Sequence, residues 1–553
     1  MFTGRLIAPH QHTGTEWMLT RERDAVPGGI LADEPGLGKT VQTIYTICTN
    51  RNGPTLVIVP KSIKRQWIEH VREFSELTMF SFTGDGRIEP VDPTDPTDPI
   101  GPIDPAHPVY RNIVDHDVTI ATYETAMRSK ILPTIAFDRI VLDEAHRIRN
   151  GSTRTRRAID KFNARIKWAI TGTPLLSAPR DFRSLVNWVG VDARVGSDIQ
   201  TLASTYMLRR TFEQLAGQCE RLRLPPKRVH VHRVDLNVDE KRTYNEIVQY
   251  ARLAIRAGDD AIRNGENRAE ILQHILAIIS KLQQLVVSPE LIRDIVEDVT
   301  CSIFGNQRHA EAMENDTCAI CMEAPDTPCK TECGHKFCEH CLVSACCVSS
   351  TCPLCRAQIT MGSVAKHIDS VDTPINGTSS KLAKVAELIA APTAKKVIVF
   401  THFTKEAELI VDLAKSMGTP AESMTGSTSD ADRSRIVDAF NATEQKCVLV
   451  SNIAVGGVGL NLQTADTVIF ASLDWTPANE LQAIARAHRI GSTGCVTVHR
   501  IVANGSIDEH VLRLQDEKLK HAAVLFGDSK FHSKLGIDTS DIYNFSQLFS
   551  PIQ

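Results

Sequence analysis

The stretch GLGKT (36–40) constrains the fold of this chain more than any other feature, because it joins a short apolar strand to a helix. At such a junction glycines let backbone N–H groups approach phosphate oxygens, a lysine reaches the β- and γ-phosphates, and a threonine hydroxyl ligates Mg²⁺. The usual pattern begins with a glycine where this chain has Asp33. A chance glycine turn before a helix is the alternative. The predicted nucleotide-binding residues in this stretch are Asp33, Gly36, Leu37, Gly38, Lys39 and Thr40.

An acidic tetrad, Asp143-Glu144-Ala145-His146, follows a second apolar strand at 139–142. The carboxyl end of a strand is where Mg²⁺ is held in folds of this kind. We expect Asp143 to hold the ion and Glu144 to orient or deprotonate the attacking water. We expect His146 to couple this site to the next motif. A capped helix start would also favour acids, but the position after GLGKT favours a nucleotide site.

A basic helix near the end of the chain runs from Gln482 to Gly491 and carries Arg486 and Arg489 on one face. Nucleotide hydrolysis requires positive charge near the γ-phosphate in the transition state, and an arginine supplied there raises turnover by about 10³–10⁵. A solvated basic helix is the alternative. If the two arginines belong to a separate lobe, the nucleotide is hydrolysed only when the lobes close.

Two regions alternate short β-branched runs with amphipathic stretches, which predicts an α/β fold of two doubly wound lobes with parallel sheets. Between about 200 and 300 helical patterns replace strand patterns, and 271–285 is predicted to form a buried helix. The expected strands are 29–33, 55–59, 118–121, 139–142 and 167–170 in the first lobe, and 396–400, 447–451, 467–470 and 496–500 in the second. Helices are expected at 40–49 and 63–74.

Length and composition bound the remaining possibilities. A chain of 553 residues with 42% hydrophobic residues suits three or four domains. A formal net charge of −4 means that any nucleic-acid surface has to be a local basic one. No apolar run reaches the roughly 20 residues of a membrane helix, so we expect an intracellular chain without membrane contact. Prolines at every third position from Pro90 to Pro108 predict an exposed polyproline insertion in the first lobe.

Cysteines in metal-ligand spacing are concentrated between the two lobes, and in an intracellular chain this clustering favours metal over disulfides. Two closed tetrahedral Zn²⁺ sites require eight ligands, and the spacing supplies eight in the pattern of a RING finger. Buried thiols without metal are the alternative. The predicted zinc ligands are Cys318, Cys321, Cys333, His335, Cys338, Cys341, Cys352 and Cys355, with Cys329, His340, Cys346 and Cys347 as spare candidates. In the interleaved RING topology, the first, second, fifth and sixth ligands would bind one ion and the other four the second.

A series of signatures in one order resembles the Swi/Snf family of superfamily-two ATPases, specifically the branch with a RING finger inserted between two RecA-like lobes. They are LIAPHQHTGTEWM (6–18), LADEPGLGKT (31–40), LVIVPKS (56–62), TIATYET (119–125), VLDEAHRIRN (141–150), ITGTP (170–174), YMLRRT (206–211), VIVFTHFT (397–404), SNIAVGGVGLNLQTAD (451–466) and DWTPANELQAIARAHRIGS (474–492). Two departures, Thr476 for a common asparagine and Ser492 for a common glutamine, remove neither a charge nor a metal ligand.

The resemblance implies ATP and Mg²⁺ as cofactors. It assigns Gln11 to the adenine edge, and it places Gly457, Gln482 and the two arginines at the phosphates from the second lobe. It also implies a motor that moves along double-stranded DNA through backbone contacts, which carry no base information. The rivals are an RNA helicase and a non-motor scaffold. By the resemblance, Tyr123 with its neighbours and the Gly459-Leu460-Asn461 loop would track the DNA backbone. Lys61, Lys64 and Arg65 follow a strand end, which is a good position for a phosphate contact. A solvated surface is the default interpretation of the basic run that contains Arg147, Arg149, Arg154, Arg156 and Arg157.

The resemblance to RING ligases implies a ubiquitin-conjugating enzyme as partner. Ile320 and the Pro353-Leu354 pair would present an apolar shelf to that enzyme, and Arg356 would contact ubiquitin. The alternative is a zinc-stapled docking module. We expect the nucleus as the location in a eukaryote, and the host cell or virion for a viral source. The expected domains are 1–195 (first lobe, insertion about 84–108), 196–310 (helical region), 316–358 (RING finger), 378–530 (second lobe) and 531–553 (tail).

Overall fold

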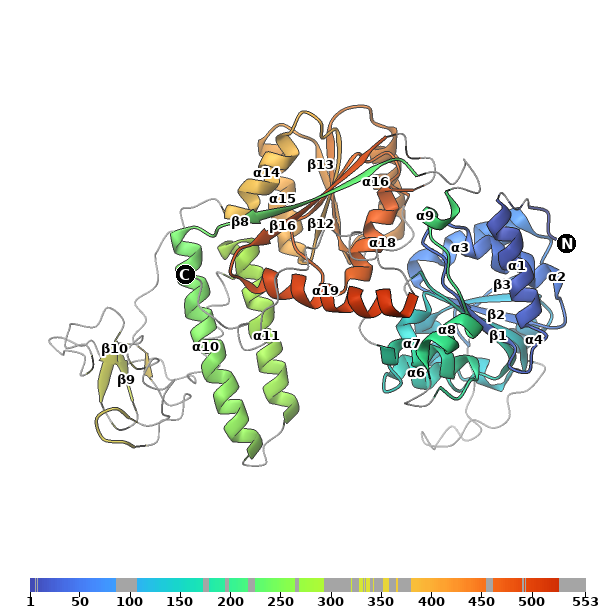
Figure 1. Cartoon of the computed structure of the whole chain (residues 1–553), viewed down its shortest axis with the longest axis horizontal. Helices are drawn as coiled ribbons and strands as arrows, with labels where there is room; N and C mark the ends of the chain where they lie inside the picture. The colour runs from blue at the N-terminus through green and yellow to red at the C-terminus, as the bar shows by residue number, and fades with distance from the viewer. Residues whose placement is uncertain are drawn as a thin grey trace.

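The computed structural model describes residues 1–4, 6, 8–85, 107–172, 179–193, 198–216, 224–263, 268–292, 320, 328–331, 333, 335–338, 342, 352–357, 365–366, 379–453, 461–489, 492 and 494–526. Figure 1 shows two α/β lobes side by side, a pair of long helices beside the second lobe, and a small β module at the far end.

The first lobe is a seven-stranded parallel sheet in the order β3-β4-β2-β5-β6-β1-β7, as the apolar runs predict. Its strands are β1 (Gly28–Leu31), β2 (Thr55–Val59), β3 (Met79–Ser81), β4 (Val118–Thr122), β5 (Phe137–Asp143), β6 (Ala164–Ile170) and β7 (Met207–Leu208). Its helices are α1 (Pro9–Arg21), α2 (Lys39–Thr49), α3 (Lys61–Phe74), α4 (Pro108–Val114), α5 (Tyr123–Arg128), α6 (Arg154–Ile159), α7 (Pro179–Val189), α8 (Ile199–Tyr206) and α9 (Phe212–Leu215). Since parallel strands end at one edge, the loops after β1 and β5 meet there.

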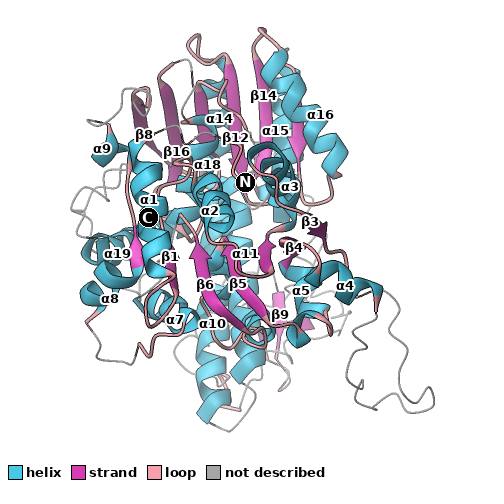
Figure 2. Cartoon of the chain, turned by 90° about the vertical axis from the view of Figure 1, so that its right-hand side faces the viewer, coloured by secondary structure: helices cyan, strands magenta, loops and turns pink. Residues whose placement is uncertain are grey.

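The second lobe is a six-stranded parallel sheet in the order β13-β14-β12-β15-β16-β8. Figure 2 shows this sheet above that of the first lobe, with helices packed around both. Its strands are β12 (Lys396–Thr401), β13 (Ala421–Met424), β14 (Cys447–Asn452), β15 (Thr467–Phe470) and β16 (Val496–Ala503), joined by β8. Its helices are α14 (Ser380–Ala390), α15 (Thr404–Ser416), α16 (Asp430–Ala442), α18 (Pro477–Ala487) and α19 (Ile507–Phe526). The predicted fold of two parallel-sheet α/β lobes is therefore confirmed.

Strand β8 (Lys227–Val234) corrects the expectation that strand signals stop between 200 and 300. It lies in parallel register with Val496–Ala503 at the edge of the second sheet, where its green ribbon runs beside red strands in Figure 1. Nε2 of His232 lies 2.8 Å from Nδ1 of His499 across this pair. Arginines and histidines alternate with valines along β8 and no side chain is fully buried, so the apolar signal of an edge strand is weak.

Helices α10 (Val238–Arg263) and α11 (Arg268–Val287) form the helical pair. Ile278, Leu282 and Leu285 of α11 are buried, but Leu276 is 63% exposed, so the predicted buried helix is covered on one face only. The small module contains the antiparallel strands β9 (Pro328–Lys330), β10 (Lys336–Cys338) and β11 (Ala365–Lys366). Within the described ranges, no helix combines the length and apolarity needed to span a membrane.

The two lobes also contact each other through α19, which runs beneath the second lobe toward the first (Figure 1) and packs against α8. Ala203 of α8 belongs to the same buried cluster as Leu519 and Ala522 of α19. Pro108, the last proline of the repeat, begins α4. The other repeat prolines lie outside the described residues.

Candidate nucleotide site and zinc cluster

The loop after β1 has the backbone geometry that its glycines permit. Gly36 and Gly38 have φ values of 99° and 79°, in the left-handed region that favours glycine. Leu37 between them is buried against Ala8, Phe212 and Leu215, and its carbonyl lies 3.0 Å from Nε2 of His10. The predicted GLGKT loop is thus held in place by the buried Leu37 side chain and by the contact of its carbonyl with His10.

Lys39 and Gln11 both lie against this loop. The Lys39 ammonium donates to the carbonyls of Asp33 (2.7 Å) and Glu34 (3.3 Å). Burial lowers the pKa of Lys39, although the nearby Glu144 carboxylate opposes that shift. Nε2 of Gln11 lies 2.4 Å from where a Cβ on Gly38 would stand, so only glycine leaves room for it. Thr40 follows Lys39 in the first turn of α2.

The Asp33 carboxylate is already paired with a side chain that sequence reasoning did not single out. Arg210 forms an ion pair with it through two nitrogens, one of them Nε at 2.9 Å, and Asp33 is fully buried. Arg210 also donates a hydrogen bond of 2.9 Å to Oε1 of Gln42, and Nε2 of Gln42 in turn donates to the Asp33 carboxylate. The Asp33 carboxylate is therefore engaged by Arg210 and Gln42, while its carbonyl accepts from Lys39 of the loop. Arg210 stands in the YMLRRT stretch, and 177 positions separate it from Asp33.

Asp143 ends β5 and is held by donors on three of its atoms. Oδ2 accepts from Nε1 of Trp67 at 2.7 Å, and Oδ1 accepts from the backbone N–H of Glu144 at 2.9 Å. The hydroxyl of Tyr123 donates to the Asp143 carbonyl at 2.9 Å. Burial, and after it the Glu144 charge, raise the pKa of Asp143 to about 6. The paired acids titrate together because their charges repel.

Glu144 adopts a left-handed backbone conformation with φ of 50°, which a non-glycine residue rarely takes without a functional reason. Its Oε2 lies 3.2 Å from Nδ1 of His146, which is 3.4 Å from Oγ1 of Thr171. Burial opposes ionisation, but the His146 hydrogen bond and the Lys39 charge hold the pKa of Glu144 below its usual value. His146 therefore contacts both the acid and the ITGTP stretch, and its predicted coupling role stays a prediction.

The second lobe brings α18 and the residues that follow it onto this site. The helix ends at Ala487, so the prediction that Arg489 shares one helical face with Arg486 is wrong. Nε2 of Gln482 lies 3.4 Å from Oε2 of Glu144. Cγ of Arg489 lies 3.9 Å from where a Cβ on Gly36 would stand, so its stem covers the loop. Burial lowers the pKa of Arg486 to about 10, while the charges of Glu144 and Asp143 oppose the shift. The structure thus gathers residues from both lobes at one edge; Gly457 lies outside the described residues.

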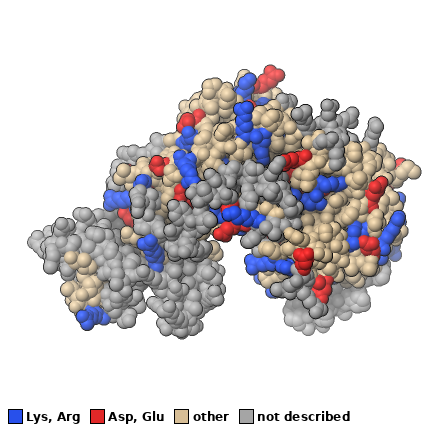
Figure 3. All heavy atoms as spheres, viewed as in Figure 1, with Lys and Arg blue, Asp and Glu red and all other residues tan. Residues whose placement is uncertain are grey.

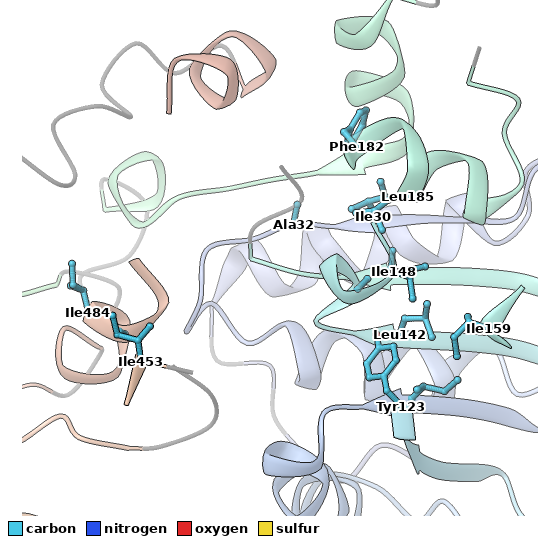
Figure 4. Packing of buried hydrophobic residues seen from close by; sticks show 14 of the residues in the cluster. Ile30, Ala32, Tyr123, Leu142, Ile148, Ile159, Phe182, Leu185, Ile453 and Ile484 are labelled. Carbon is cyan, nitrogen blue, oxygen red and sulfur yellow. The ribbon is translucent and has the colours of Figure 1, made fainter. Parts of the chain in front are cut away.

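Several side chains predicted to contact DNA instead form hydrogen bonds within the first lobe. Tyr123 is 1% exposed and packs near Leu142 (Figure 4), so its prediction as a DNA contact is wrong; the phenol supports Asp143 instead. Lys64 donates to the Phe82 carbonyl at 2.7 Å. Arg156 is buried and bonds Asp160 and Ser184. On the face in Figure 3, basic and acidic side chains are interspersed over both lobes.

The predicted zinc cluster lies only partly within the described residues. Donor atoms of Cys333, His335, Cys352 and Cys355 all lie within 4.8 Å of one another, and these are the four ligands predicted for one ion. Tetrahedral Zn²⁺ takes sulfur at about 2.3 Å and nitrogen at about 2.0–2.1 Å, which fits four donors this close. The side chains of the other set, Cys318, Cys321, Cys338 and Cys341, lie outside the described residues.

Two parallel-sheet lobes, with a phosphate loop and paired acids on one and an arginine helix on the other, define a helicase-like ATP hydrolase. Comparison with known families agrees. Residues 10–194 and 192–291 match the SNF2-related domain, and residues 380–491 match the helicase conserved C-terminal domain. The chain belongs to the SNF2 (Swi/Snf) family of superfamily-two helicase-like ATPases.

Proteins similar to this chain include two named DNA repair proteins. The chain is 27% identical to RAD5B of Arabidopsis thaliana over 92% of its own length and 46% of that protein. It is 28% identical to RAD5 of Yarrowia lipolytica over 91% of its length and 56% of that protein. The chain thus spans about half the length of these relatives. The SWI2/SNF2 ATPase core of Sulfolobus solfataricus in complex with dsDNA aligns over 97% of this chain and 98% of that one, with 21% identity and a TM-score of 0.36.

Proposed function

We propose that this chain couples ATP hydrolysis between its lobes to translocation along double-stranded DNA. The observation that carries the proposal is the approach of α18 to the first lobe. Gln482 reaches Glu144, and the Arg489 stem covers Gly36 of the phosphate loop. A site completed by two lobes makes hydrolysis depend on their closure, and hydrolysis then releases them. A cycle of closure and release is what a stepping motor requires.

The chemistry assigned to each group follows from its surroundings. Lys39 exchanges its bonds to the loop carbonyls for bonds to the β- and γ-phosphates. Glu144, held as a carboxylate by His146, orients the attacking water and accepts its proton. Arg486 and Arg489 offset the negative charge that develops on the γ-phosphate. Gln11, against Gly38, is placed to read the adenine edge.

The residues present also fit Mg²⁺. Asp143 and Thr40 supply the hard oxygen ligands that this ion prefers. Each Asp143 carboxylate oxygen accepts a hydrogen bond, from Trp67 or from the Glu144 backbone, and still has a further lone pair. When bound, the ion would offset negative charge on the phosphates. Asp143 and Thr40 would hold it at the edge of the sheet.

Double-stranded DNA is the proposed track because two relatives of this chain are named DNA repair proteins. Lys61 and Arg65, both exposed on the first turns of α3, are candidate backbone contacts. In a eukaryote this substrate would place the chain in the nucleus. Contacts to phosphates alone make binding tolerant of sequence and sensitive to salt.

The deciding experiment measures the ATP hydrolysis rate with duplex DNA, single-stranded DNA, RNA or no nucleic acid. We expect duplex DNA to give the largest stimulation, with Glu144→Gln as the hydrolysis-dead control. A preference for RNA would move the chain to the rival class of RNA helicases. An equal rate in all four conditions would exclude a nucleic-acid motor.

We further propose that the zinc cluster belongs to a RING finger with two Zn²⁺ ions that recruits a ubiquitin-conjugating enzyme. Ile320 and Leu354 are 42% and 54% exposed, which supports an apolar docking surface, with Pro353 and Arg356 also exposed beside it. Ile320→Ala should abolish ubiquitin-chain synthesis in vitro without loss of zinc. Leu276→Ala, on α11, is the matched control for an exposed apolar side chain. Unchanged synthesis in Ile320→Ala would favour a docking module without ligase activity.

A further inference from the structure

Trp67 of α3 donates a hydrogen bond that restrains one carboxylate oxygen of Asp143. Its Nε1 lies 2.7 Å from Oδ2 of Asp143, across 76 positions of sequence, and the indole is 1% exposed. The other two donors to this residue, the backbone of Glu144 and the hydroxyl of Tyr123, reach Oδ1 and the main-chain carbonyl. Among the described residues the indole is the donor to Oδ2, and together with the Glu144 N–H on Oδ1 it restrains the rotation of the carboxylate about its Cβ–Cγ bond.

We propose that Trp67 is a positioning residue for the nucleotide-bound Mg²⁺, which it serves by holding Asp143 with its remaining lone pairs toward the phosphates. This inference rests on the proposed ATP hydrolysis. A carboxylate oxygen has two lone pairs, so the indole bond leaves Oδ2 able to bind the ion or its water. Donors that orient metal-ligating side chains change metal affinity by about 10–100-fold when they are removed.

A purely structural role has to be separated from this one, because Trp67 also packs in the core with Ile63, Val71 and Val141. The first lobe contains a matched control. Trp168 is likewise fully buried, and its Nε1 donates 2.9 Å to Oε1 of Glu22, a carboxylate paired with Arg139. Trp67→Phe and Trp168→Phe each remove one indole N–H from a buried carboxylate and shrink one ring, but only Trp67→Phe touches the proposed metal ligand.

The experiment measures binding of a fluorescent ATP analogue to the full chain, in a Mg²⁺ titration and in EDTA. We expect Trp67→Phe to raise the Mg²⁺ concentration at half-maximal binding by about 10-fold or more. Affinity in EDTA should stay unchanged, and Trp168→Phe should alter neither quantity. A wild-type Mg²⁺ dependence in Trp67→Phe overturns the proposal, as does an equal change in both variants.

Should Trp67→Phe fail to fold by its melting temperature, benzothienylalanine at position 67 preserves the ring volume and removes only the donor. A wild-type Mg²⁺ dependence in that variant overturns the proposal equally. Nucleotide binding reports on the inference even if hydrolysis is absent. A wild-type chain that binds Mg²⁺-nucleotide without hydrolysing it would therefore contradict the proposed function and leave the role of Trp67 testable.

Discussion

Removal of Arg210 should destabilise the first lobe more than the loss of any surface charge. Asp33 is fully buried and Arg210 is nearly so, and the two side chains are joined by two hydrogen bonds. Arg210→Ala leaves the carboxylate in the interior without its cation. Breaking a buried pair on one side costs about 3–5 kcal/mol. For a lobe of this size, each kcal/mol lowers the melting temperature by about 2–4 °C, so the expected fall is about 6–20 °C.

Tryptophan fluorescence provides the assay, because four of the five tryptophans, at 17, 67, 168 and 188, lie in the first lobe. Thermal unfolding followed by this signal reports mainly on that lobe. Arg165→Ala is the control, since Arg165 is half exposed in its pair with Asp138 and exposed pairs contribute little. Its melting temperature should be unchanged.

A double mutant tests the mechanism. Arg210→Ala leaves the Asp33 carboxylate unpaired, and Asp33→Asn removes that charge. The double mutant should therefore lose less stability than the sum of the two single losses. The buried pair does not stabilise the loop if the two losses of stability simply add, or if Arg210→Ala has the melting temperature of the wild type. ATP affinity measured on the same proteins should fall with Arg210→Ala, because Asp33 also anchors Lys39 through its carbonyl.

Three further outcomes are expected. Glu144→Gln should bind ATP with wild-type affinity and hydrolyse it at least about 10²-fold more slowly, because the base that accepts the water proton is gone; wild-type turnover would remove Glu144 from this role. Arg489→Ala should lower turnover by about 10³-fold or more while ATP binding persists; an unchanged rate would mean that α18 does not complete the site. Zinc removal with a chelator, or Cys352→Ala, should unfold the β9–β10 module, since metal binding drives folding of such segments. Basal ATP hydrolysis should survive, and retained structure without metal, followed by circular dichroism, would contradict the assignment.

Much of the site was predictable because its parts are local. GLGKT needs only a strand before it and a helix after it, so five consecutive residues specify a phosphate loop. Arg486 and Arg489 stand only three positions apart, so both can reach the same site even though α18 ends at Ala487 and Arg489 lies beyond the helix. Cys333 and His335, two positions apart, likewise approach by spacing alone, and Cys352 with Cys355 completes their set in the structure.

Contacts between distant segments were decided by tertiary packing. No periodicity relates Arg210 to Asp33, or Trp67 to Asp143, because each pair meets only after α3 and β7 have docked on the sheet. Packing in the core of the first lobe buries Tyr123, which the sequence predicts as a DNA contact. In the second lobe, β8 pairs with β16, a strand that lies more than 260 residues away in the chain.

The sequence by itself determined the two α/β lobes and the residue types at the nucleotide site, since hydrophobic period and short motifs act over a few neighbouring residues. The tertiary structure alone decided which buried groups restrain those residues. A hydrogen bond or ion pair depends on distances of about 3 Å, and the packing of whole elements sets such distances between remote parts of a chain. The position of Asp143 at the end of β5 is thus encoded locally, whereas the indole that donates to its carboxylate comes from α3, 76 positions earlier in the chain.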